Sequence, residues 1–405
     1  MEKIIRKKCL CCNTTRLKEV LNLEQHSFAD RFIPKKIKTH KDPTYPLILD
    51  MCQTCKFFQL RYITNPEARY NEIDYSYTSA NSKYAIDHWN KYFIDVAKQM
   101  KTISKKILEI GSNDGYLSKL FADNKSSTVS VDASSFMVKV SKKKGLVSEN
   151  LLFNFENSIK LKKKYGRQDI IIANNVFNHS DNPKDFLRGV KNILGSEGIF
   201  IFEQPYFSKS IIEEKFDQIY HEHISYFTVL NIYNLLKKSD FKILSISFND
   251  YHGGSIRTFA TLNKNNLKTF NAKDLIRKEI DSKIYNLTFF KNLFKKIKLK
   301  KIQIREKILS YKKKGFTIAC IGAAAKANTI LTYYELNSKL IDFITDGSKF
   351  KINKFTPKTR LEIKNDNELK KYKKIICIIL AWNINKLLKK KLLKINKNIK
   401  FLNIG

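Results

Sequence analysis

The chain has 405 residues, of which 43% are apolar, enough for two or three hydrophobic cores. Lysine and arginine number 76 against 38 acidic residues, so the formal net charge is +38. No run approaches the roughly 20 apolar residues that a membrane-spanning helix needs, and the first residues lack the apolar core of an export signal. We therefore expect a cytoplasmic protein with no membrane partner.

The positive charge is spread along the chain rather than gathered in one arm. Lysines concentrate at 291–301 and 386–400, where apolar residues also recur regularly. This pattern favours solvated helix faces, although so large an excess could also mark a nucleic-acid partner. We treat a nucleic-acid partner as unlikely on this pattern, and note that the charge would help to attract an anionic substrate.

Four of the seven cysteines form two Cys-x-x-Cys pairs, Cys9 with Cys12 and Cys52 with Cys55. Each pair is typical of a zinc knuckle, and four thiolates complete a tetrahedral structural site with no open position for catalysis. Two disulfides would fit a cytoplasmic chain poorly. Cys11 lies inside the first pair and could replace either neighbour as a ligand.

Residues 106–117 are predicted to form a buried strand, a tight loop and a helix. An apolar run leads into a glycine-containing turn, after which apolar residues recur at helical spacing. Gly111 and Gly115 let the backbone approach a ligand closely. Glu109 and Asp114 would repel a phosphate but suit a cationic ligand with a ribose and an amino acid. That description fits S-adenosylmethionine (SAM).

Two later strand-like runs supply further candidates for the cofactor site. Residues 128–132 end in Asp132, an acid placed where dinucleotide folds bind both ribose hydroxyls. Residues 169–175 are expected as the fourth strand of the same sheet, after a weaker third. An α/β domain without a methyl donor is the plainer alternative. The predicted cofactor-binding residues are Glu109, Gly111, Asn113, Asp114, Gly115, Asp132, Asn174 and Asn175.

Helix and strand signals alternate in two regions, so the predicted fold class is α/β. We expect a zinc module at 1–65, a Rossmann-like methyltransferase domain at 66–262, a helical linker at 263–314 and a second Rossmann-like domain at 315–405. The last begins with a strand, a small-residue loop at 322–328 and a helix. Its helix N-terminus could hold a diphosphate, although the loop lacks the second glycine and the Lys-Ser/Thr pair of a P-loop. A purely structural domain is the alternative.

Three clusters that contain histidine follow the predicted cofactor strands. His221 and His223 stand within three residues, His179 precedes them and His252 follows, in a chain with seven histidines. A lone histidine is most often a surface or core residue, but three such clusters indicate an active site. Residues 221 and 223 do not share a helix face, so general acid–base work fits better than a metal.

This ordered set of motifs resembles the SAM-dependent C-methyltransferases that act on nucleotide-linked 4-keto deoxysugars in antibiotic-sugar and surface-polysaccharide pathways. The resemblance spans nearly the whole chain. It is carried by the cysteine pairs with Gln59 and Leu60, and by residues 75–79, 109–115, 175–179, 203–206, 220–223, 252–257 and 322–328. It implies a class I methyltransferase domain between a zinc module and a sugar-nucleotide-binding domain, with SAM and structural zinc as cofactors. The chain departs from the family at Asp132, where an acid is kept, and at Ala327, which replaces a glycine in the expected diphosphate loop.

The family's mechanism implies roles for the later motifs. A base removes a proton next to the ketone, and the enolate carbon attacks the sulfonium methyl in line while nearby donors stabilise the oxyanion. The resemblance makes His223 the leading base, Tyr220 its alternate or enolate partner and Glu222 a residue that orients them, with Tyr77 and His179 beside the sugar. The implied substrate-binding residues are His252, Arg257, Gly322, Lys326, Asn328 and Lys349.

Two other classes of protein remain as alternatives. A nucleic-acid methyltransferase that modifies amino groups usually carries an Asn/Asp-Pro-Pro-aromatic turn after the fourth strand, where this chain has Asn174-Asn175-Val176-Phe177. A non-catalytic sugar-nucleotide-binding protein would bind no SAM. We expect a monomer or a weak homo-oligomer.

Overall fold

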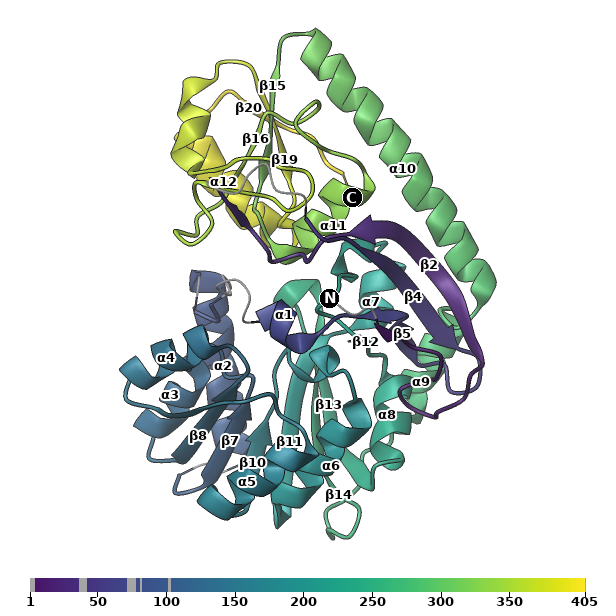
Figure 1. Ribbon diagram of the computed structural model, residues 1–405, viewed down its shortest axis with the longest axis vertical. Helices are drawn as coiled ribbons and strands as arrows, with labels where there is room; N and C mark the ends of the chain where they lie inside the picture. The colour runs from purple at the N-terminus through teal and green to yellow at the C-terminus, as the bar shows by residue number, and fades with distance from the viewer. Residues whose placement is uncertain (1–3, 36–41, 71–77, 81, 101–102, 405) are drawn as a thin grey trace.

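The computed structural model describes residues 4–35, 42–70, 78–80, 82–100 and 103–404. Two α/β lobes lie at opposite ends, with the N-terminal strands between them on one side (Figure 1). The long helix α10 (Leu287–Lys313) runs along that side from one lobe to the other. The α/β fold class predicted from the sequence is confirmed.

The larger lobe contains a seven-stranded sheet in the order β13-β14-β11-β10-β7-β8-β9. Its strands are β7 (Lys106–Ile110), β8 (Ser127–Asp132), β9 (Val147–Asn150), β10 (Gln168–Ile172), β11 (Leu194–Pro205), β13 (Phe241–Asn249) and β14 (Ser255–Leu262). The first five are parallel, and β14 is antiparallel to both of its neighbours. The predicted weak third strand is β9, and the predicted fourth is β10. Strand order reverses at β7, which opens a crevice at the carboxyl ends of the strands.

Helices on both faces cover this sheet. They are α1 (Pro66–Tyr70), α2 (Lys83–Met100), α3 (Tyr116–Asp123), α4 (Ser135–Lys143), α5 (Phe155–Tyr165), α6 (Pro183–Ile193), α7 (Phe207–Ile212) and α8 (Val229–Lys237). Ser134, Asn154, Asn182 and Thr228 start four of them, each accepting a hydrogen bond from the backbone N–H three residues on. Three of these caps, Ser134, Asn154 and Asn182, lie in the loops around the crevice and help to fix those loops.

The N-terminal module is a small antiparallel structure. Its strands are β1 (Ile4–Ile5), β2 (Leu17–His26), β3 (Ile33–Pro34), β4 (Tyr45–Cys52), β5 (Phe58–Leu60) and β6 (Tyr62–Ile63). Strand β12 (Ser225–Tyr226), from the larger lobe, extends its main sheet by pairing with β5. Strand β3 pairs with β17 (Lys354–Phe355) of the other lobe. The module is therefore hydrogen-bonded through backbone to both lobes, across the boundaries that the sequence suggests.

The smaller lobe has a parallel sheet in the order β18-β16-β15-β19-β20. Its elements are β15 (Thr317–Ile321), α11 (Ala325–Tyr333), β16 (Phe343–Thr345), β18 (Ile363–Lys364), β19 (Ile375–Ile379), α12 (Asn385–Ile395) and β20 (Ile399–Phe401). Two helices, α9 (Lys273–Asp281) and α10, precede it, as the apolar spacing predicted. Phe290, Ile297 and Ile304 of α10 are buried, whereas Lys291, Lys295 and other lysines face solvent. No described helix combines the length and apolarity needed to cross a membrane.

Candidate active site

A cavity of about 310 Å³ opens at the carboxyl ends of β7, β8, β9 and β10. Residues 109–113, 131–134, 151–154 and 174–176 form its walls, each set following one of these parallel strands. Arg69, Tyr70 and Asp181 complete the wall opposite the strand ends, and a salt bridge of 2.5 Å joins Arg69 to Asp181. This is the position where open α/β sheets bind nucleotide-type cofactors.

Two carboxyl groups predicted for the cofactor site line this cavity. Asp132 accepts hydrogen bonds from the backbone N–H groups of Asn113 and Ser134, both at 2.8 Å, while burial raises its pKa to about 6. Glu109 accepts a hydrogen bond from the Ser118 hydroxyl, and burial raises its pKa to about 8. A cationic ligand would lower both pKa values, because an opposite charge favours the ionised carboxylate.

Asp114 and Gly115 act behind the loop, since neither lines the cavity. The Asp114 carboxylate forms a 3.1 Å ion pair with Lys144 and accepts a hydrogen bond from the Ser79 hydroxyl. Gly115 has a φ of 74° and stands at the start of α3, where a Cβ would lie 2.5 Å from the Ser141 oxygen. Both residues therefore hold the loop in shape, and the direct cofactor contact expected of them from the sequence stays a prediction.

The far side of the cavity carries polar atoms that are buried without a hydrogen-bond partner among the described residues. These are Nδ2 of Asn174, Oδ1 of Asn175 and Nε2 of His179, and all three residues line the cavity. Buried polar atoms are nearly always paired, so these three atoms fit a polar ligand. The Oδ1 of Asn174 accepts a hydrogen bond from the Glu203 backbone N–H at 3.0 Å.

Substituting Gly111 with alanine should strongly weaken SAM binding. Gly111 has a φ of 70°, and a Cβ there would lie 2.6 Å from the Val176 Cβ, so the cavity wall formed by residues 174–176 must move. Gly145 is the matched control, because its φ is 80° but a Cβ would meet no atom within 4 Å. Both variants carry backbone strain of about 1 kcal/mol. Isothermal titration calorimetry should therefore show lost SAM affinity in Gly111→Ala alone; equal losses would contradict the steric argument.

SAM binding should weaken as the pH falls through about 6. Asp132 is ionised above its pKa, where it can accept ribose hydroxyl hydrogen bonds and attract the sulfonium, and it is neutral below. The association constant should fall by up to about tenfold per pH unit on the acid side. Calorimetric titrations from about pH 7.5 to about pH 5 would measure this. Asp132→Asn should bind more weakly with a flatter pH profile, and an unchanged profile would exclude Asp132.

The half-buried Tyr220 and the buried His223 form a hydrogen-bonded pair. The His223 Nδ1 lies 3.0 Å from the Gln218 carbonyl oxygen, which can only accept, so Nδ1 carries the proton. Nε2 is then the basic nitrogen, and it accepts the Tyr220 hydroxyl hydrogen at 2.7 Å. Burial lowers the pKa of His223 to about 3, so the ring is neutral at physiological pH. The pair thus presents a neutral imidazole with a defined tautomer.

His179 connects this pair to the cavity. Its ring centroid lies 5.1 Å from that of His223, and Nδ1 lies 3.4 Å from the Tyr70 hydroxyl. Glu222 is buried, which raises its pKa to about 7. His221, in contrast, turns its ring against Phe28 and Tyr45 of the N-terminal module. Tyr77 lies outside the described residues.

The smaller lobe brings Lys326 towards the same region. Its ammonium lies 2.5 Å from the Asn383 side-chain oxygen and 4.1 Å from the Trp382 ring centroid, and burial lowers its pKa to about 8. His252 of the larger lobe is close enough for the Lys326 charge to help burial lower its pKa to about 3.

Three of the other four residues predicted to bind the substrate already have partners within the chain. Arg257 forms a 2.8 Å ion pair with the fully buried Glu203 and stacks on Tyr92, so its guanidinium serves the core of the larger lobe. The Asn328 side chain donates to the Ala29 carbonyl of the N-terminal module. The Gly322 N–H is already bonded to the Thr345 carbonyl at 2.7 Å. Lys349 is exposed.

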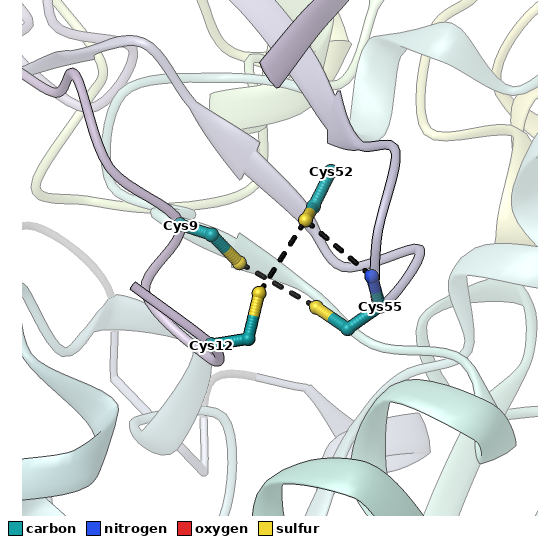
Figure 2. A group of neighbouring side chains, drawn as sticks. All are labelled: Cys9, Cys12, Cys52 and Cys55. Carbon is teal, nitrogen blue, oxygen red and sulfur yellow. Dashed lines mark hydrogen bonds between the residues drawn. The ribbon is translucent and has the colours of Figure 1, made fainter. Parts of the chain in front are cut away.

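The four cysteine sulfurs of the two knuckles converge, as Figure 2 shows. All lie within 4.8 Å of one another, with Cys9 3.5 Å from Cys55 and Cys12 3.6 Å from Cys52. Thiolates bound to one tetrahedral zinc at about 2.3 Å are about 3.8 Å apart, so the set fits the ion. Cys11 is not part of this group; its backbone N–H points to the Cys9 sulfur at 3.4 Å. The predicted four-cysteine zinc site is confirmed.

Comparison with known proteins identifies the same three parts. A "Putative zinc binding domain" model matches residues 9–70, a "Methyltransferase domain" model 85–246 and a "C-methyltransferase C-terminal domain" model 250–402. Together with the strand order and the cavity, these matches define a class I SAM-dependent methyltransferase with structural zinc. More particularly, the chain is a SAM-dependent C-methyltransferase. The C-methyltransferase NovU of Streptomyces niveus is 24% identical over 388 residues, which cover 95% of this chain and 92% of that protein.

Solved structures of methyltransferases are similar to part of the chain. A SAM-dependent methyltransferase from Clostridium acetobutylicum is 17% identical with a TM-score of 0.35, covering 45% of this chain and 93% of that one. Another from Anabaena variabilis is 13% identical with a TM-score of 0.35, covering 44% and 92%.

Residues that sequence reasoning missed include Arg69, Tyr70 and Asp181, which line the cavity. The Asn-Pro helix start at Asn182 was a usable signal for Asp181, since it places the preceding residues beside the crevice. The Gln218 carbonyl that orients His223 is a backbone group and has no sequence signature.

Proposed function

We propose that this enzyme transfers a methyl group from SAM to the carbon next to the ketone of a nucleotide-linked 4-keto deoxysugar. The observation that most supports this proposal is the Tyr220–His223 pair. The His223 ring has a defined tautomer with a basic Nε2, and it adjoins His179 at the cavity wall. The product would serve deoxysugar or surface-polysaccharide synthesis in the cytoplasm. The three-part likeness to a C-methyltransferase supports carbon as the acceptor atom.

The proposed reaction begins with a proton transfer. The C–H bond next to the ketone breaks and its proton ends on Nε2 of His223, either directly or through the Tyr220 oxygen. A neutral histidine can accept this proton because Nε2 holds none beforehand. Tyr220 and His179 both lie beside the His223 ring and would supply hydrogen-bond donors to the enolate oxygen. Glu222 directly precedes His223 and follows Tyr220 by two residues, and it would help to orient them.

The second step forms the carbon–carbon bond. The enolate carbon attacks the methyl group, the bond from methyl to sulfur breaks, and the sulfur keeps the electron pair as S-adenosylhomocysteine leaves. SAM supplies the methyl electrophile, while the chain holds the two reactants in line. Asp132, Asn175 and the loop at Gly111 would fix the donor. Lys326, the cation in the small-residue loop of the smaller lobe, would meet the nucleotide diphosphate.

The test is a pair of assays on the purified zinc-loaded protein. In deuterium oxide with a 4-keto-6-deoxysugar nucleotide, the hydrogen next to the ketone should exchange, and adding SAM should give a methylated sugar detectable by mass spectrometry and NMR. Calorimetry should show SAM binding. A protein that binds SAM but neither exchanges nor methylates such sugars would contradict the proposal. Salt-sensitive binding and methylation of nucleic acid would replace it.

A further inference from the structure

Two short turns of the larger lobe and one of the smaller lobe meet beside His223. They are η3 (Phe216–Gln218), η4 (Tyr251–Gly253) and η6 (Trp382–Ile384). The Trp382 indole N–H donates a 2.6 Å hydrogen bond to the Asp217 carboxylate, across the junction between the lobes.

The Asp217 carboxylate is buried and is held from several sides. Asp217 is only 2% exposed. Burial raises the pKa of Asp217, and this is opposed by the charge of Lys326, the Trp382 hydrogen bond and the charge of Lys215. Both lysine ammonium groups lie over the Trp382 ring, at 4.1 Å and 4.8 Å from its centroid. A buried carboxylate needs such partners, so the indole bond determines where Asp217 sits.

The residue after Asp217 controls the histidine. The Gln218 carbonyl accepts the Nδ1 hydrogen of His223, and the Gln218 side chain donates to the His252 carbonyl at 2.8 Å. The Gln218 carbonyl belongs to the following peptide, whose Ile219 N–H donates to the Phe216 carbonyl at 3.0 Å. An anchored Asp217 carboxylate therefore helps to hold the η3 turn that presents the carbonyl selecting the tautomer.

The fit of Trp382 against the larger lobe is close. A Cβ at Gly253 would lie 2.2 Å from two carbons of the indole, so the ring rests directly on the bare backbone of η4. Gly253 also has a φ of 89°, which favours glycine. The indole is thus held by a steric contact as well as by its hydrogen bond.

We propose that Trp382 and Asp217 are positioning residues through which the smaller lobe fixes the tautomer of His223. Their hydrogen bond holds the η3 turn, the Gln218 carbonyl keeps the proton on Nδ1, and Nε2 stays available as a proton acceptor. This inference rests on the proposed function in its assignment of His223 as the base. It makes docking of the smaller lobe a condition for proton abstraction.

Trp382→Phe tests the inference, because it keeps an aromatic side chain and removes the N–H that Asp217 accepts, together with the outer indole carbons that rest on Gly253. Nitrogen-15 NMR of histidine-labelled protein should show one Nδ1–H tautomer for His223 in the wild type and a mixture in the variant. The kcat for methyl transfer should fall by about 10-fold to 100-fold, as a misplaced catalytic group would predict. The KM for SAM should change by less than about twofold, because the donor cavity is separate.

Asp217 supplies the matched pair of variants. Asp217→Asn keeps an oxygen that can accept the indole hydrogen, so kcat should stay within about threefold of the wild type. Asp217→Ala should reproduce the loss and the mixed tautomer of Trp382→Phe. The double variant Asp217→Ala/Trp382→Phe should be no worse than either single one, because both break the same contact.

The outcomes separate this inference from the proposed function. The NMR measurement needs no substrate, so it reports on the histidine even if the acceptor is not a keto sugar. If the wild type neither exchanges nor methylates keto sugars, that result would contradict the proposed function but not the positioning role of Trp382 and Asp217. A Trp382→Phe protein that keeps the Nδ1–H tautomer, or that loses it with no change in kcat, would overturn the positioning role.

Discussion

His223→Ala should lower the rate of methyl transfer by about 10²-fold to 10⁴-fold, the usual contribution of a general base. The substitution removes the nitrogen that accepts the Tyr220 hydroxyl and that we propose accepts the substrate proton. SAM affinity should be nearly unchanged, because His223 is not among the residues that line the cavity. The expected signature is thus a loss of kcat without a loss of cofactor binding.

The measurement that isolates this step is hydrogen exchange in deuterium oxide without SAM, since no methyl transfer is then needed. His221→Phe is the matched control two residues away, because its ring packs against Phe28 and Tyr45 and phenylalanine preserves that packing. The control should exchange at nearly the wild-type rate. Exchange at full rate in a folded His223→Ala protein would remove His223 from the role of base, and Tyr220→Phe would then be the next variant to examine.

Cys52→Ser should remove the zinc and with it both stability and activity. Structural zinc contributes about 10–16 kcal/mol of apparent binding free energy in isolated zinc-finger peptides, and that energy is folding energy. Cys52 ends β4, whose neighbour β5 pairs with β12, and β12 begins two residues after His223. Loss of the ion should therefore loosen the backbone that carries the proposed base.

Metal analysis should find about one zinc per wild-type chain and almost none in Cys52→Ser. The thermal midpoint should fall by on the order of 10 °C. Cys11→Ser is the control, because the Cys11 sulfur lies outside the group of four, and this variant should keep its zinc. Zinc lost from Cys11→Ser but retained in Cys52→Ser would show that the ligand set is wrong.

Local patterns were sufficient to predict much of the architecture. The strand and loop at Glu109 to Gly115, the acid at Asp132 and the two cysteine pairs each depend on residues close in sequence. Such features are governed by hydrophobic periodicity, glycine conformation and ligand chemistry, all of which are local. The α/β class, the cavity position and the zinc site could therefore be derived before the structure.

Other features depend on contacts between distant residues. From the sequence, Arg257 was expected to bind the substrate, but in the structure it forms an ion pair with Glu203 within the sheet. Asn328 was expected at a diphosphate but bonds to Ala29. The catalytic roles of His223, Tyr220, Glu222 and His179 stay predictions, as do the domain boundaries. The partners of these side chains are set by tertiary packing and give no signal in the local sequence. For that reason some assignments differ between sequence and structure, and others stay predictions.

The pairing of β3 with β17 has a consequence for synthesis on the ribosome. Ile33 leaves the tunnel early, but its partner Phe355 is made near the end. At about 5–20 residues per second, the edge strand must wait on the order of tens of seconds. Ile33 is buried in the folded chain, so during that delay its apolar side chain is exposed to other nascent chains, which favours aggregation. Slowing translation of the last hundred or so residues should therefore lower the soluble yield more than slowing the first.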